Sequence, residues 1–160
     1  NFVGLACAQS YPLSRGRSHI ASTNVDAPPV IYPRYLSHPL DLEIFARHVQ
    51  ALENLRNAKE LEPFFKLNGK RNHPDAFSIG TLEGAKKYVL DTATTAYHSC
   101  GTTAMFPKDK GGVIDAELRV HGISNLRIVD ASIFPMITRG NPMSTVYAVA
   151  EKAADIIKNH

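Results

Sequence analysis

Residues 111–157 read GGVIDAELRVHGISNLRIVDASIFPMITRGNPMSTVYAVAEKAADII and combine two kinds of secondary-structure pattern. The first half contains short apolar runs separated by turn residues, which predict a strand–turn–strand arrangement. The second half predicts a helix over residues 141–159, with Asn141 as the N-cap and Pro142 at the first helical position. Strands followed by an amphipathic helix predict a mixed α/β (α+β) fold. The short apolar runs are residues 113–115, 118–121 and 126–129.

Two further helices are expected upstream of this stretch. Pro39 suits the first position of one helix, and apolar residues then recur at spacings of three and four. A second helix is expected to begin near Thr81, to run through Ala93 and to end in residues 97–102. The proline-rich residues 27–33 predict an extended surface loop rather than a central strand, and residues 62–79 predict irregular chain with at most one short helical piece. The recurring apolar positions are Leu42, Phe45, Val49 and Leu52 in the first helix, and Leu82, Ala85 and Val89 in the second.

The composition is that of an ordinary globular protein and excludes several classes. The chain has 160 residues, of which 44% are hydrophobic and 21% charged, so it suits one domain or a compact part of a larger one. No stretch approaches the roughly 20 consecutive apolar residues of a membrane span. The net charge of +3 lies in short basic groups without aromatic residues, so nucleic acid is not an expected partner. We expect a soluble chain of unknown localisation, because no secretory signal or glycosylation sequon is present.

Two polar residues lie at the ends of predicted helices: His98 where one helix is expected to end, and Asn141 where another is expected to begin. His98 lies in the segment Tyr97-His98-Ser99-Cys100-Gly101-Thr102, and an imidazole there could accept a proton from an alcohol and return it. Taken alone, a structural histidine is the favoured interpretation of His98. The Asn141 side chain is expected to cap the helix by accepting from backbone N–H groups, and the alternative is that it faces a ligand at the positive end of the helix dipole.

Three other candidate features are weaker. Asp130 follows the last apolar run, where a carboxylate either caps a following helix or accepts hydrogen bonds from cofactor hydroxyls, and the cap is favoured. A Cys–His nucleophile formed by Cys100 and His98 is discounted, because side chains two positions apart on a loop rarely meet. The two cysteines cannot build a disulfide framework, and the histidines lack metal-ligand spacing, so no metal site is expected.

In their order along the chain, these segments resemble the C-terminal end of the glucose–methanol–choline (GMC) oxidoreductases. That family contains flavoenzymes such as aryl-alcohol oxidase, glucose oxidase and choline oxidase. The residues that carry the resemblance extend over most of the last 65 positions, and two upstream segments are similar to fungal members in particular. The matching segments are residues 97–102, 111–122, 125–135, 140–143 and 150–157, with residues 13–16 and 35–41 upstream.

The resemblance implies FAD-dependent oxidation of a small-molecule alcohol to a carbonyl by a His/Asn pair. His98 would be the catalytic base above the flavin ring, and Asn141 would orient the substrate oxygen. The implied fold is the C-terminal portion of the GMC fold: residues 1–95 belong to an antiparallel substrate-domain sheet with packed helices, and residues 96–160 return to the FAD domain. The residues implied to lie near the flavin nucleotide are Asp130, Ala131, Asn141, Pro142, Met143 and Ser144.

One departure from the family pattern leaves the function of the chain by itself open. The G-x-G-x-x-G fingerprint, which cradles the pyrophosphate of a dinucleotide, does not occur among the 10 glycines. We therefore expect the N-terminal dinucleotide-binding part to be absent, and this chain to hold FAD weakly or not at all by itself. The missing FAD-binding part or chain is then an expected partner. The alternatives are a truncated protein that performs cofactor-independent acid–base chemistry (a dehydratase, isomerase or cyclase) and an inactive binding fragment.

Overall fold

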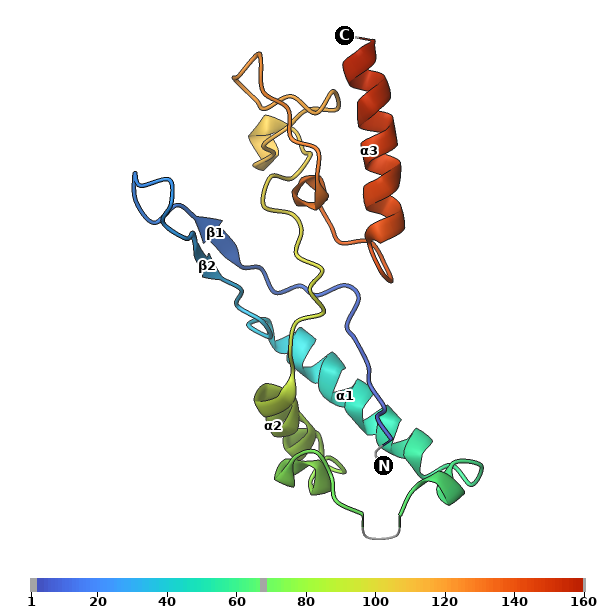
Figure 1. The fold of residues 1–160 in the computed structure, drawn as a ribbon. Coiled ribbons are helices and arrows are strands. Elements are labelled where there is room, and N and C mark those ends of the chain that lie inside the picture. Colours follow the sequence, from blue (N-terminus) through green and yellow to red (C-terminus); the bar gives the residue numbers. More distant parts are fainter. Residues whose placement is uncertain (1–2, 67–68, 160) are drawn as a thin grey trace. The chain divides into compact units, whose positions relative to one another are not determined.

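The computed structural model describes residues 3–66 and 69–159 and contains three helices and a small antiparallel two-stranded sheet within them (Figure 1). The chain divides into two compact units. We call residues 1–16 with 31–96 the helical unit, and residues 17–30 with 97–160 the C-terminal unit. The elements in chain order are β1 (Arg17–His19), β2 (Val30–Tyr32), α1 (Pro39–Arg56), η1 (Glu62–Phe64), η2 (Pro74–Phe77), α2 (Leu82–Thr92), η3 (Lys108–Lys110), η4 (Ala131–Ile133) and α3 (Met143–Lys158), where η denotes a 3-10 turn.

Both helices of the helical unit begin as their sequences predict. Pro39 occupies the first turn of α1, and the ring nitrogen Nδ1 of His38 accepts the Leu40 N–H at 3.2 Å. In α2 the Thr81 hydroxyl accepts the Gly84 N–H at 3.1 Å, which is a standard N-cap bond. The helix ends at Thr92, so the extended chain before the predicted site starts a few residues earlier than the pattern suggests.

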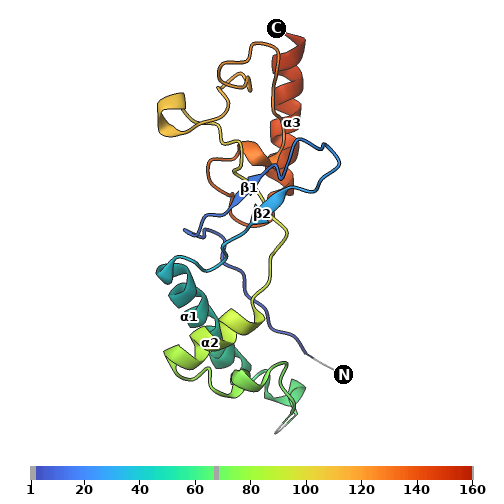
Figure 2. The same ribbon diagram turned by 90° about the vertical axis from the view of Figure 1, so that its left-hand side faces the viewer.

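The core of the helical unit lies between α1 and α2, which pack side by side in both ribbon views (Figures 1 and 2). Ala46 of α1 and Ala85 of α2 are fully buried, and small residues at these positions let the two helices approach closely. The Gln50 amide donates to the Ile79 carbonyl at 3.1 Å and joins α1 to the segment before α2. The buried residues of this core are Ala46, Val49, Ile79, Ala85 and Val89.

Two of the loop predictions need small corrections. Residues 30–32, expected in an extended loop, form β2, which lies beside β1 (Figure 2). This is compatible with the prolines, since Pro29 and Pro33 stand just outside the three-residue strand. The stretch 62–79 contains two short 3-10 turns, η1 and η2, rather than at most one helical piece. Each of them has a proline in its first turn, which favours such a start.

The strands predicted between residues 113 and 129 are wrong as regular elements. The chain forms isolated bridges there, which pair Met105 with Ile114, Ile114 with Val120, and Arg119 with Arg127. Left-handed backbone conformations at Leu118 (φ 67°) and Gly122 (φ 86°) turn the chain after every few residues and prevent a continuous ladder. Alternating apolar residues therefore supply core side chains here without forming strands.

The core of the C-terminal unit lies under one face of α3. Ile114 is fully buried, and it clusters with Leu118, Ile133, Phe134 and the α3 residue Ala153. The predicted last helix is confirmed, although it begins at Met143 rather than at residue 141. Within the described residues, no helix is long and apolar enough to cross a membrane.

Candidate active site

The predicted catalytic histidine lies in the C-terminal unit, on chain that is hydrogen-bonded to the turn after Asp130. The Gly101 N–H donates to the Ala131 carbonyl at 3.4 Å, the Thr103 N–H to the Ser132 carbonyl at 3.0 Å, and the Met105 N–H to the Ile133 carbonyl at 2.8 Å. A hydrogen bond between the Thr103 and Ser132 hydroxyls adds to this pairing. The segment after His98 is thus fixed against η4 by its backbone.

The backbone around His98 is irregular on both sides. Tyr97 has φ of 60°, which is uncommon for a residue other than glycine, and Gly101 has φ of 89°. A Cβ atom at Gly101 would lie 3.3 Å from the Phe134 carbonyl oxygen, so glycine suits both the turn and the close approach. The His98 ring is half-buried, and within the described chain no hydrogen bond or ion pair holds it. Its nitrogens are therefore available to a substrate.

Asp130 performs the structural role that its sequence position favours. Its Oδ1 accepts the Ser132 N–H at 2.7 Å and caps η4, so the turn that holds the histidine segment begins at this carboxylate. The residue itself is exposed, and Ala131 beside it is half-buried. The cap occupies one carboxylate oxygen and leaves the side chain accessible to a ligand.

The start of α3 differs from the expected capping arrangement. Pro142 is the N-cap residue, with φ of −75° and ψ of −3°, and its carbonyl accepts the Val146 N–H at 2.9 Å. The prediction that Asn141 caps the helix is wrong, because Pro142 already has helical dihedral angles and supplies the first helical carbonyl itself. No side-chain hydrogen bond caps this end of the helix in the described chain, and Asn141, Met143 and Ser144 are exposed. The helix therefore presents free N–H groups and the positive end of its dipole.

The structure brings the three predicted site segments together through a shared core. Cys100 from the histidine segment, Ala131 after Asp130, and Val146 from the first turns of α3 all pack on the buried cluster of the C-terminal unit. This explains how residues far apart in the sequence are held in one unit. No hydrogen bond joins His98 to Asn141 within the described residues, so any cooperation between them would run through a bound substrate.

Asp41 is a functional-looking residue that the sequence analysis missed, and its role is structural. Its carboxylate is 1% exposed and accepts the Gln9 amide and the Leu13 N–H at 2.9 Å each, together with the N–H and hydroxyl of Ser14. Burial raises the pKa of Asp41, but these hydrogen bonds outweigh that effect and bring the pKa below its ordinary value. Asp41 thus joins residues 13–16 and 35–41, two segments that seemed separate in the sequence.

A similar carboxylate shapes the C-terminal unit. Oδ1 of Asp115 accepts the Glu117 N–H at 3.0 Å and the Arg119 N–H at 2.8 Å, and so closes the turn that contains Leu118. Burial acts to raise the pKa of Asp115, whereas these hydrogen bonds and the Arg119 charge lower it, with a net decrease. Asp is a common turn residue, so Asp115 itself, in the sequence Gly112-Val113-Ile114-Asp115, is the sequence signal for this turn.

Comparisons with known proteins give a consistent result. A family model described as GMC oxidoreductase matches residues 12–150. The dehydrogenase pkfF of Emericella nidulans is 41% identical over 155 residues, which are 96% of this chain and 24% of that protein. A fungal aryl-alcohol oxidase structure has a TM-score of 0.77 and 34% identity, covering 92% of this chain and 24% of that one. An FAD-dependent oxidoreductase from Chaetomium thermophilum has a TM-score of 0.83 and 32% identity, covering 93% and 25%.

These relatives are much longer than the sequence that matches them. The chain spans about a quarter of the length of each. The matched part extends through both units and includes every residue of the candidate site, since residues 12–150 contain His98, Asp130 and Asn141. The similarity therefore concerns the site segments as well as the fold around them.

Proposed function

Since this chain belongs to the GMC oxidoreductase family, we propose that it carries the catalytic pair for FAD-dependent oxidation of an alcohol to a carbonyl compound. The observation that carries the proposal is the hydrogen-bonded pairing of the His98 segment with the turn after Asp130. This pairing fixes the histidine segment in the same unit as the start of α3, and within residues 3–66 and 69–159 the His98 ring nitrogens and the first N–H groups of α3 have no side-chain partner.

The chain's own residues have separate tasks in this reaction. A ring nitrogen of His98 accepts the proton of the substrate hydroxyl, and the Asn141 amide donates a hydrogen bond to the substrate oxygen. FAD, when bound, would supply the two-electron oxidant that accepts a hydride from the carbon bearing this hydroxyl, and the alcohol would become a carbonyl compound.

Groups at the start of α3 and at Asp130 fit part of a flavin nucleotide. The free N–H groups at the start of α3, around Pro142, Met143 and Ser144, are suited to the negative charge of a reduced flavin ring. The exposed carboxylate of Asp130, beside Ala131, is suited to hydroxyl groups of the nucleotide. The phosphates need a different site, because the G-x-G-x-x-G spacing does not occur in the sequence.

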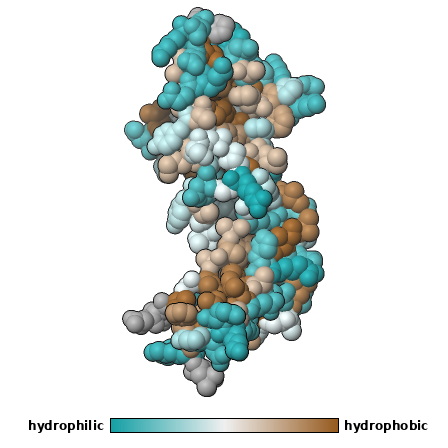
Figure 3. All heavy atoms as spheres, turned by 90° about the vertical axis from the view of Figure 1, so that its right-hand side faces the viewer, coloured by the Kyte–Doolittle hydropathy of each residue, from teal (hydrophilic) through white to brown (hydrophobic). Residues whose placement is uncertain are grey.

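The outer face of α3 supports a partner that would supply the phosphate site. One face of α3 packs on the C-terminal core through Val146, Val149, Ala153 and Ile156. Another face carries an exposed apolar stripe, in which Met143 is 63% exposed, Tyr147 66% and Ile157 50%. In the upper part of the surface in Figure 3, residues coloured as hydrophobic lie among hydrophilic ones. A helix that is apolar on two faces is typical of the interior of a larger structure, and we propose that an FAD-binding part covers the stripe.

The decisive experiment replaces His98 by Ala in the complete protein that carries this chain. We expect kcat for alcohol oxidation to fall by about 100-fold or more, because the general base is lost. His48→Ala is the matched control, since His48 lies exposed on α1, and its kcat should not change. A normal kcat in the His98 variant contradicts the assignment.

The spectrum of the 160-residue chain separates this proposal from the cofactor-free alternative. We expect the chain alone to be colourless and inactive, and to become yellow only together with an FAD-binding part. A colourless chain that by itself dehydrates, isomerises or cyclises a small metabolite contradicts the flavoenzyme proposal and favours cofactor-independent acid–base chemistry.

A further inference from the structure

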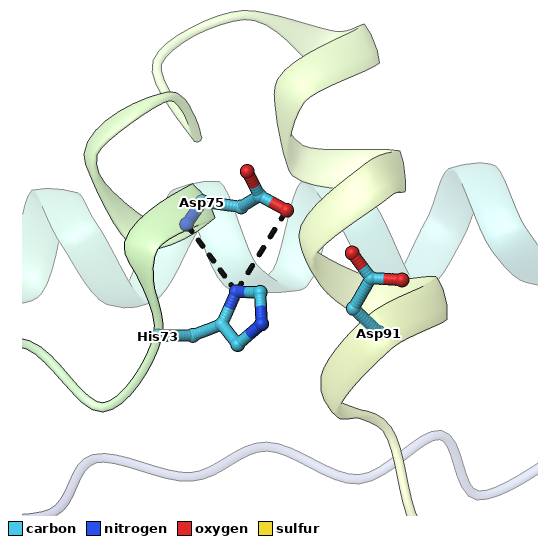
Figure 4. Close-up of side chains that lie close together, drawn as sticks. All are labelled: His73, Asp75 and Asp91. Atoms are coloured by element: carbon cyan, nitrogen blue, oxygen red, sulfur yellow. Dashed lines mark hydrogen bonds and ion pairs between the residues drawn. The ribbon is translucent and has the colours of Figure 1, made fainter.

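A group of potential metal ligands lies in the helical unit, outside the candidate active site. It consists of His73, Asp75 and Asp91, whose ligand atoms all lie within 4.8 Å of one another. Figure 4 shows the His73 ring and the two carboxylates near one another, with Asp75 coming from η2 and Asp91 from α2. The spacing of the histidines in the sequence predicts no metal site. That pattern could not reveal this group, because two of its three potential ligands are aspartates and one of them comes from another element.

The surrounding hydrogen bonds hold these side chains in place without a metal. Nδ1 of His73 accepts the Asp75 N–H at 3.2 Å and lies 3.7 Å from Asp75 Oδ2. The Asn72 amide and the Tyr88 hydroxyl are joined by contacts of 2.7 and 3.1 Å, which tie the chain before η2 to α2. The His73 and Tyr88 rings pack in an edge-type arrangement with 6.2 Å between their centroids. Metal sites in proteins commonly depend on such outer contacts to orient their ligands.

The charges at this group favour a cation. Nζ of Lys87 lies 2.8 Å from Asp75 Oδ1, and this hydrogen bond lowers the pKa of Asp75 while it raises that of Lys87. The ammonium group neutralises one carboxylate, and the second carboxylate, that of Asp91, adds a negative charge to the group. Lys87 is 67% exposed and can leave for water without breaking a buried contact.

We propose that His73, Asp75 and Asp91 bind one divalent transition-metal ion of the zinc class, and that the ion displaces Lys87 from Asp75. Imidazole with carboxylates is a typical donor set for such an ion, whereas magnesium prefers oxygen ligands alone. Ligand atoms of a tetrahedral zinc site, each at about 2.1 Å from the metal, lie about 3.4 Å apart. The ligand atoms of the three residues lie within 4.8 Å of one another, so a small movement of the exposed Asp91 side chain and of the His73 ring would bring them to this spacing.

The ion would connect η2 to α2 and so stabilise the helical unit. Its ligands lie wholly in that unit, whereas the candidate catalytic residues lie in the C-terminal unit. The site is therefore structural, and it does not depend on the proposed oxidation. Binding to the folded state alone would raise the unfolding temperature as the metal concentration rises.

Calorimetric titration of the untagged 160-residue chain with ZnCl₂ tests the proposal, with MgCl₂ as the comparison. We expect one zinc ion per chain and no comparable magnesium binding. Asp91→Asn and His73→Gln should each weaken zinc binding by about tenfold or more, because each removes a ligand. Lys87→Met should strengthen it, since the competing cation is gone, and His48→Gln should have no effect. Circular dichroism of each variant checks that the helices are retained.

Three results would overturn the proposal. Equal zinc affinity in the wild type and in the folded Asp91→Asn variant would show that zinc binds elsewhere. An unchanged or weaker affinity in Lys87→Met would contradict the displacement of Lys87, and this exposed substitution leaves the fold intact. Magnesium binding as tight as zinc binding would exclude His73 as a ligand.

Discussion

In the helical unit, α1 and α2 pack directly on each other, and the buried Asp41 carboxylate fastens the N-terminal segment to α1. In the C-terminal unit, one helix covers chain that consists of turns and isolated bridges, and the apolar core around Ile114 holds these together. The first unit thus depends on regular elements and a buried charge, and the second on apolar packing of irregular chain. The candidate catalytic residues all lie in the second unit, because irregular backbone can aim side chains and N–H groups in directions that a helix interior does not allow.

The largest effect is expected for Ile114→Ala in the C-terminal unit. Ile114 is fully buried at the crossing of two bridges, so its loss leaves a cavity that turns and loops cannot close. We expect a decrease of about 4 kcal/mol in the free energy of unfolding. Hydrogen exchange should become faster in α3 and stay unchanged in α1. Equally faster exchange in both helices would show that the two units unfold together and would remove the distinction between them.

A somewhat smaller effect is expected for Asp41→Asn in the helical unit. The amide keeps one acceptor oxygen but turns N–H donors toward the Ser14 N–H, which loses its partner. We expect a loss of about 3 kcal/mol in stability, measured by urea denaturation. Amide hydrogen exchange in this variant should be faster than in the wild type in α1 and unchanged in α3. A loss below about 1 kcal/mol would mean that apolar packing, rather than this carboxylate, fastens the N-terminal segment.

The pH dependence of the free energy of unfolding should differ between Asp41→Asn and Ile114→Ala. The pKa of Asp41 is lower in the folded chain than in the unfolded chain, so its contribution is complete above the unfolded pKa of about 3.9 and is lost as the pH falls through the folded value. The stability difference between the wild type and Asp41→Asn should therefore shrink below about pH 4. Ile114→Ala should show the same deficit at each pH, since it carries no titrating group. A constant difference for Asp41→Asn would contradict the lowered pKa.

The smallest effect is expected for Glu43→Gln on the outer face of α1. Glu43 pairs with Arg47 at 2.7 Å, but both side chains are exposed to water. Exposed pairs of this kind contribute little because solvent screens them. Urea denaturation should show no change beyond experimental error. A loss as large as that of Asp41→Asn would mean that surface charges, and not the buried carboxylate, determine the stability of α1.

The three helices are the parts of the fold that could be predicted from the sequence, because their apolar residues recur regularly over several turns. α1, α2 and α3 follow apolar spacings of three and four, and Pro39 and Thr81 mark the starts of two of them. Alternating residues in 113–129 predicted strands, yet the same alternation serves isolated bridges, and the left-handed conformation of Leu118 has no sequence signal. Helices can be predicted from the spacing of residues within one segment, whereas isolated bridges depend on contacts between segments.

The candidate site could be predicted only in part, and for a related reason. His98 and Asn141 stand out through their resemblance to a family, and their chemistry stays a proposal. The capping role of Asn141 was wrong because the dihedral angles of Pro142 decide where α3 starts. Asp41 and the His73 group depend on segments that meet only in the folded chain, so no local pattern reveals them.

The attachment of the histidine segment to η4 has a consequence for protein engineering. Gly101, Thr103 and Met105 are fastened through peptide N–H groups and carbonyls, which every amino acid except proline supplies. Ser99, which precedes Gly101, and Thr102, which lies between Gly101 and Thr103, are exposed. A saturation library at these two positions should therefore sample new substrate preferences while His98 keeps its place, and the same freedom is available to natural divergence.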